Sequence, residues 1–110
     1  MITPALPSAI SRYFDAKNAH DVDGTLAAFA DNASVHDEGR QMSGRAAIRE
    51  WIEVTTHKYR DVAVPLAVEH DGRSTIVTAR VSGTFPGSPV ELRFRFRDNG
   101  ENIASLEIGG

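Results

Sequence analysis

Residues 21–37, DVDGTLAAFADNASVHD, predict a short helix that runs directly into a strand ending on an acid. Asp21 is a suitable N-cap for the helix, which we expect to end near residues 31–32. The first half of the segment carries apolar residues at the spacing of one buried helical face: Leu26, Ala27, Phe29 and Ala30.

The second half of this segment alternates and predicts a strand around residues 33–37. Val35 and Asp37 point to one side of that strand, and His36 points to the other. Asp37 is therefore the last residue of a core-facing row. Burying a carboxylate there costs free energy, so we expect it to have a polar partner or a function. We take Asp37 as the candidate catalytic residue, the alternative being that it only caps the turn into residues 38–39.

The residues on either side of this segment predict two further helices. A first helix is capped either by Ser8 or by the Thr3-Pro4 pair. Its apolar stripe places a tyrosine among buried residues: Ile10, Tyr13, Phe14 and Lys17. We expect a polar loop over residues 38–44, followed by a helix that Ser43 caps. The buried face of that helix has four members: Ile48, Trp51, Ile52 and Thr55.

After residue 58 the pattern alternates and predicts four strands, at residues 62–68, 74–85, 90–97 and 102–108. Pro65 indicates that the first of them is an edge strand or carries a bulge. Turn signals at residues 70–73 and 86–89 separate the first three strands. The third is the clearest, because Val90, Leu92, Phe94 and Phe96 alternate with Glu91, Arg93, Arg95 and Arg97.

This order of elements, with helices first and an antiparallel meander afterwards, predicts an α+β fold. The sheet has one apolar and one charged face, so the helices must cover the apolar face. A strongly bent sheet over a long helix leaves a conical hollow, which we expect Tyr13, Asp37 and Trp51 to line. No repeat or linker divides the chain, so residues 1–110 are expected to form a single domain.

The composition is that of an ordinary globular protein, with 41% hydrophobic and 25% charged residues. The net charge of −3 argues against nucleic acid or an anionic membrane as the main partner. The apolar stretch at residues 62–68 is too short to cross a bilayer, and the N-terminus lacks the pattern of a signal peptide. The absence of cysteine fits a reducing compartment, so we expect a cytoplasmic protein.

The residues of the first half resemble a known superfamily. SRYFDAKNAHDVDGTLAAFADNASVHD, residues 11–37, is similar to the opening of nuclear transport factor 2-like, or SnoaL-like, proteins, and in particular to bacterial ketosteroid isomerases. SGRAAIREW at residues 43–51 resembles the start of the third helix of that family. The second half matches in strand pattern more than in residues. The resemblance implies a cone-shaped, cystatin-like α+β barrel with a deep, mostly apolar pocket.

The resemblance also implies roles for two residues and shows a departure at a third. Asp37 aligns with the general base, which in ketosteroid isomerase moves a proton between carbons beside a carbonyl. Tyr13 aligns with the phenol that donates a hydrogen bond to the enolate oxygen. Leu92, directly before RFRF at residues 93–96, stands where that family has a protonated Asp as second donor. Half of the expected oxyanion hole is therefore missing from this sequence.

We expect an apolar small-molecule substrate that is held by the walls of the pocket. The candidate substrate-binding residues are Trp51, Leu92, Val35 and Phe94. No cluster of Asp, Glu and His has the spacing of metal ligands, so we expect neither a metal nor another cofactor. Assistance from a histidine stays open. His36 points away from Asp37 unless a bulge intervenes, and neither His57 nor His70 has a spacing that argues for this role.

The RFRFR run at residues 93–97 separates its aromatic and basic side chains onto opposite faces of a strand. It therefore lacks the mixed face of a nucleic-acid platform. Three arginines on one surface of an acidic protein instead predict a homodimer through the outer face of the sheet, with Glu69 or Glu107 pairing with them. Dimerisation through this face is common in the superfamily that the sequence resembles.

Taken together, these residues predict an isomerase, cyclase or dehydratase step on a carbonyl compound, with Asp37 as base and Tyr13 polarising an oxygen. The alternative is a non-catalytic ligand-binding or protein-interaction module, because this fold hosts both. An open hollow lined by an Asp with a shifted pKa would favour the enzyme. A filled hollow would favour the module.

Overall fold

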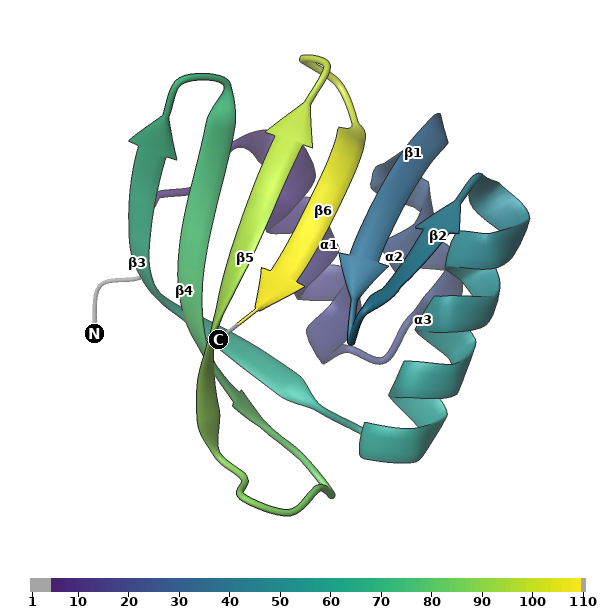
Figure 1. Cartoon of the computed structure of the whole chain (residues 1–110), viewed down its shortest axis with the longest axis vertical. Coiled ribbons are helices and arrows are strands. Elements are labelled where there is room, and N and C mark those ends of the chain that lie inside the picture. The colour runs from purple at the N-terminus through teal and green to yellow at the C-terminus, as the bar shows by residue number, and fades with distance from the viewer. Residues whose placement is uncertain (1–4, 110) are drawn as a thin grey trace.

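The computed structural model describes residues 5–109, in which three helices pack on one side of a six-stranded sheet (Figure 1). The helices are α1 (Ser8–Asn18), α2 (Val22–Ala27) and α3 (Arg45–Tyr59). The strands are β1 (Phe29–Asp37), β2 (Arg40–Ser43), β3 (Val62–Asp71), β4 (Ser74–Ser82), β5 (Val90–Asp98) and β6 (Ile103–Gly109). No helix in this part of the chain has the length and apolar character needed to cross a membrane.

The strands are arranged in the order β2-β1-β6-β5-β4-β3. Strands β3 to β6 form the predicted antiparallel meander, and β1 joins it by a parallel pairing with β6. The sheet curves around the helices and stays open between its edge strands, β2 and β3 (Figure 1). The predicted α+β class is confirmed, with a curved and mostly antiparallel sheet around N-terminal helices.

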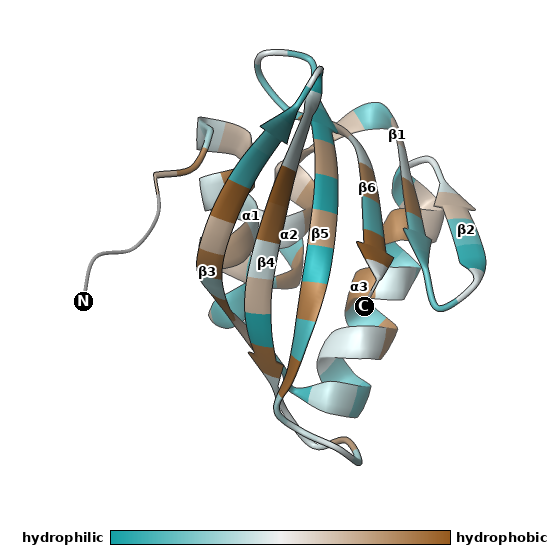
Figure 2. Ribbon diagram, turned by 60° about the vertical axis from the view of Figure 1, so that its left-hand side comes forward, coloured by the Kyte–Doolittle hydropathy of each residue, from teal (hydrophilic) through white to brown (hydrophobic). Residues whose placement is uncertain are grey.

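The core is built where the apolar stripe of α1 meets the inner face of β5, whose alternation is visible in Figure 2. The Phe14 ring lies edge-on to those of Phe94 and Phe96, with centroids 5.3 and 5.7 Å apart. Tyr13 meets Phe29 and Phe96 in the same way, at 5.7 and 5.5 Å. Such pairs contribute about 0.5–1.5 kcal/mol each beyond the area they bury. The position of the Tyr13 ring is therefore fixed from several sides.

The second helix is shorter than predicted. It ends at Ala27 rather than near residues 31–32, although Asp21 caps it as expected, its carboxylate accepting a hydrogen bond from a first-turn N–H at 3.0 Å. The next strand begins at Phe29, where the parallel pairing with Ile103 of β6 starts. Pairing with a distant strand thus overrides the helical spacing of the local sequence.

Both predicted serine caps are wrong in position. Ser43 is the last residue of β2, and Gly44, with a φ of 85°, is the N-cap of α3. Pro7 precedes α1, of which Ser8 is the first residue, so the serine does not cap it. The Thr3-Pro4 alternative lies outside the described residues.

Two strand predictions also need correction. The polar loop expected over residues 38–44 contains β2, because Met42 pairs with Val35 and is buried with it in the core. Strand β4 ends at Ser82 rather than at residue 85. Both interpretations of Pro65 are confirmed, since β3 is an edge strand and its pairing with β4 shifts directly after this residue.

Candidate active site

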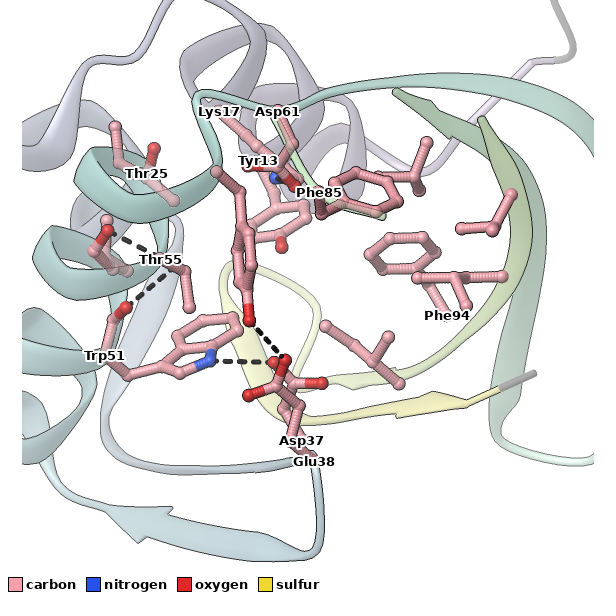
Figure 3. Close-up of a pocket in the computed structure, with 17 residues that line it drawn as sticks. Tyr13, Lys17, Thr25, Asp37, Glu38, Trp51, Thr55, Asp61, Phe85 and Phe94 are labelled. Atoms are coloured by element: carbon pink, nitrogen blue, oxygen red, sulfur yellow. Dashed lines mark hydrogen bonds and ion pairs between the residues drawn. The ribbon is translucent and has the colours of Figure 1, made fainter. Parts of the chain in front are cut away.

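A cavity of about 200 Å³ opens between α1, α3 and the inner face of the sheet (Figure 3). Its walls are mostly apolar and include side chains from three neighbouring strands: Val81, Val90, Leu92, Phe94 and Ile108. A few polar groups interrupt this lining, the combination that is usual in small-molecule sites. The hollow expected from the sequence is therefore open.

Asp37 ends β1 with its carboxylate half-buried in this cavity. Burial raises the pKa of Asp37 above its ordinary value, and the negative charge of Glu38 acts in the same direction. The Trp51 Nε1–H donates to Asp37 Oδ2 at 3.0 Å, which opposes the rise, as the positive charge of Lys17 does. Asp37 is thus a carboxylate whose affinity for a proton is increased.

Tyr13 presents its hydroxyl to the same cavity from the middle of α1 (Figure 3). The side chain is 1% exposed, and burial, followed by the charges of Asp61 and Asp37, raises the pKa of Tyr13 above its ordinary value. The phenol therefore keeps its proton at neutral pH. Within residues 5–109 its hydroxyl has no hydrogen-bond partner and opens onto the cavity, so the proton is available to a ligand.

Lys17 and Asp61 form an ion pair that the sequence did not predict. Lys17 Nζ lies 2.7 Å from Asp61 Oδ2, each side chain is 15% exposed, and both line the cavity. Lys17 does lie on the apolar stripe of α1, one turn after Tyr13, which is the signal that could have drawn attention to it. Its partner lies 44 positions away in the sequence, directly before β3, and no local pattern indicates that pairing.

A third polar contact lies on the more exposed side of the cavity. The Tyr59 hydroxyl donates to Glu38 Oε1 at 3.0 Å, and the Phe85 ring meets the Tyr59 ring edge-on with centroids 5.9 Å apart. These side chains connect the end of α3 to the turn after β1 and to the loop between β4 and β5.

The structure brings together most of the residues proposed from the sequence. Asp37, Tyr13, Trp51, Leu92 and Phe94 all line the cavity. Trp51 lies in the cavity wall as predicted. Its hydrogen bond to Asp37 was not predicted, because it joins α3 to the end of β1 and β2 lies between these two elements in the chain.

Val35 does not reach this group, although it was a candidate substrate-binding residue. It is fully buried in the core, and the cavity wall does not include it.

No histidine in the described part of the chain lines the cavity. His36 lies on the outer face of the sheet, with its Nδ1 3.9 Å from Glu107 Oε2, and His57 and His70 are exposed. Residues 5–109 also contain no group of three or more His, Asp and Glu side chains that could hold a metal ion. The polar groups that line the cavity include carboxylate, phenol and ammonium groups.

Comparisons with known proteins agree with the resemblance seen in the sequence. The family model of the SnoaL-like domain matches residues 10–101. A candidate polyketide cyclase from Sinorhizobium meliloti is 42% identical to this chain, and the match covers 94% of each chain with a TM-score of 0.89.

Two more distant structures share the fold. A protein of Catenulispora acidiphila with a ketosteroid isomerase-like fold, solved in complex with trimethylamine, is 19% identical over 96% of this chain and 87% of its own, with a TM-score of 0.83. SalBIII, an epoxide hydrolase/cyclase-like enzyme of pyran ring formation in the polyether salinomycin, is 23% identical over 92% of this chain and 86% of its own, with a TM-score of 0.79.

Proposed function

Because this chain belongs to the SnoaL-like domain family, and because Asp37 and Tyr13 share one cavity, we propose that it is an enzyme of proton transfer at carbon beside a carbonyl group. An isomerase, a cyclase or a dehydratase step on an apolar carbonyl compound would fit. The observation that carries the proposal is the Asp37 carboxylate, half-buried and with a raised pKa, in an open cavity with the free Tyr13 hydroxyl.

In this mechanism Asp37 acts as the general base. Its carboxylate takes a proton from the carbon next to the carbonyl, and the electron pair of the broken C–H bond forms a C=C bond. The carbonyl π electrons move onto the oxygen, which becomes an enolate oxygen. The Tyr13 O–H donates a hydrogen bond to this oxygen without losing its proton, which stabilises the developing charge. In a β,γ-unsaturated substrate the enolate is conjugated with the second C=C bond. Protonated Asp37 then returns the proton to the far carbon of that bond, the C=C bond moves next to the carbonyl and the C=O bond re-forms, which completes an isomerisation.

The apolar part of the substrate would contact the remaining walls of the cavity. Phe94 of β5 lies on one side and the indole of Trp51 on the other (Figure 3), and Leu92 of β5 also lines the cavity. Trp51 has a second role in this scheme, because its N–H donates to one carboxylate oxygen of Asp37 and so fixes the orientation of the carboxylate.

The experiment that separates an enzyme from a ligand-binding module is deuterium exchange at the carbon beside a carbonyl. Small cyclic ketones such as cyclohex-3-enone are incubated with the protein in D₂O, and exchange is followed by NMR against a buffer blank. Binding is followed in parallel by the fluorescence of Trp51, the one tryptophan of the chain. Enzyme-dependent exchange is expected. Saturable binding without exchange for every ketone that binds would favour the module.

We also propose that the protein is a homodimer through the outer face of its sheet. Arg93, Arg95 and Arg97 project from that face of β5, and within the chain Arg95 Nη1 is 3.5 Å from Asp71 Oδ2. Glu107 lies opposite Arg95 in the register of β5 and β6. Such exposed pairs contribute little within one chain, whereas acids of a second copy could pair with all three arginines. Sedimentation of a monomer at micromolar concentration and moderate salt would contradict this.

A further inference from the structure

The ion pair between Lys17 and Asp61 is an unexpected feature of a cavity with such apolar walls. The two side chains are largely buried, their charged atoms are 2.7 Å apart, and both line the cavity in which Asp37 and Tyr13 lie (Figure 3). Ion pairs taken out of water gain little stability, because the cost of desolvating both charges offsets their attraction. Stability alone is therefore a weak reason for this pair to be where it is.

The position of Lys17 relative to Tyr13 suggests another reason. The two residues are four positions apart in α1, so they project from the same face of the helix into the same cavity. An ammonium group has three N–H donors, and Asp61 accepts from it in the one hydrogen bond that Lys17 makes within residues 5–109. The charge of Asp61 is also one of the causes that raise the pKa of Tyr13, after burial.

We propose that Lys17, held in place by Asp61, is the second hydrogen-bond donor to the substrate oxygen that Tyr13 contacts. This role rests on the proposed function and supplies the donor that Leu92 cannot supply. When Asp37 takes the proton from carbon, the oxygen gains negative charge between the Tyr13 O–H and a Lys17 N–H. Neither donor loses its own proton. The proton taken from carbon stays on Asp37, which returns it to another carbon of the substrate.

The balance of charges in the cavity also points to the class of substrate. Three carboxylates, those of Asp37, Glu38 and Asp61, line the cavity against one ammonium, so a substrate that is already anionic would be repelled. A neutral carbonyl compound meets no such penalty. Once Asp37 has been protonated, the pair of Lys17 and Asp61 is neutral overall and leaves Lys17 beside the newly formed enolate. The site is therefore suited to a neutral carbonyl substrate that becomes charged only during the reaction.

The test uses 4-nitrophenol, an apolar phenol whose anion absorbs visible light, as a stand-in for the enolate. The probe is bound to the Asp37→Asn variant, which reproduces the uncharged state of Asp37 after proton abstraction, and its ionisation is titrated by absorbance. In this background Lys17→Met should raise the pKa of the bound probe by about one to two pH units, which corresponds to the free energy of one charge-assisted hydrogen bond. Tyr13→Phe should also raise it, and Asp61→Asn should lower it. The matched control is Lys58→Met, which removes the exposed lysine and should leave it unchanged.

A second variant guards against misfolding, because Lys17→Met leaves the largely buried charge of Asp61 without a partner. The double variant Lys17→Met/Asp61→Asn removes both charges and should still raise the pKa of the probe. If Tyr13→Phe raises that pKa and both Lys17 variants leave it unchanged, the role of Lys17 is wrong while the proposed function stands. If Tyr13→Phe has no effect either, or if the probe does not bind, both are contradicted.

Discussion

The hydrogen bond between Trp51 and Asp37 makes a sharp prediction for the variant Trp51→Phe. Phenylalanine keeps an aromatic ring in the cavity wall but removes the N–H that lies 3.0 Å from Asp37 Oδ2. Hydrogen bonds to charged groups contribute roughly 1.5–3 kcal/mol, and the half-burial of Asp37 places this one near the lower end. Since about 1.4 kcal/mol corresponds to one pH unit, the pKa of Asp37 should rise by about one unit.

The assay is NMR titration of the side-chain carboxyl carbons in protein labelled at aspartate, which needs no knowledge of the substrate. The matched control is Tyr59→Phe, which removes an O–H that donates to Glu38 instead and should leave the titration of Asp37 nearly unchanged. An unchanged or lower pKa of Asp37 in Trp51→Phe would refute the reasoning, because it would show that the Trp51 N–H does not lower the pKa that burial raises.

Three further predictions concern stability and catalysis. Folding raises the pKa of Asp37. The proton bound to Asp37 therefore stabilises the folded state fully at pH values below the pKa of Asp37 in the unfolded chain, and this contribution is lost as the pH rises through its pKa in the folded state. Asp37→Asn should therefore raise the melting temperature relative to the wild type more at about pH 7 than at about pH 4, as measured by calorimetry. Asp21→Ala should lower the free energy of unfolding by about 1 kcal/mol in urea titrations, since it removes the cap of α2. Loss of a donor typically costs about a hundredfold or more in rate, so Lys17→Met, in which neither residue 17 nor Leu92 supplies a second donor, should isomerise a β,γ-unsaturated 3-oxo steroid about a hundredfold more slowly than the wild type, and Lys17→Met/Leu92→Asp should recover part of the loss. A Lys17→Met variant as fast as the wild type would contradict this.

The sequence predicted those features that depend on neighbours along the chain. The alternation at Val90 to Arg97 is enough to define β5 and its two faces, and the stripe containing Tyr13 is enough to define the buried side of α1. The placement of Asp37 at the end of a core-facing row also follows from alternation alone. These patterns arise because a single element has to bury one face, whatever it packs against.

Features that depend on distant parts of the chain were missed. Strand β1 begins at Phe29 because β6 pairs with it, and β6 is the last element of the chain. The ion pair of Lys17 with Asp61 and the hydrogen bond of Trp51 to Asp37 join elements whose relative placement is set by the whole fold. Sequence similarity identified the two candidate catalytic residues, but the groups that hold and tune them became visible only in three dimensions.

The most direct test of the mechanism is the rate of carbon proton exchange in Asp37→Asn, measured with the ketone that the wild type turns over fastest. Asparagine keeps the shape of the side chain and removes the base, so the rate should fall by roughly two to four orders of magnitude. Ketone binding, followed by Trp51 fluorescence, should change little, and Glu38→Gln, which neutralises the adjacent carboxylate, should keep most of the activity. An Asp37→Asn variant that exchanges protons at the wild-type rate would contradict the role of Asp37 as general base.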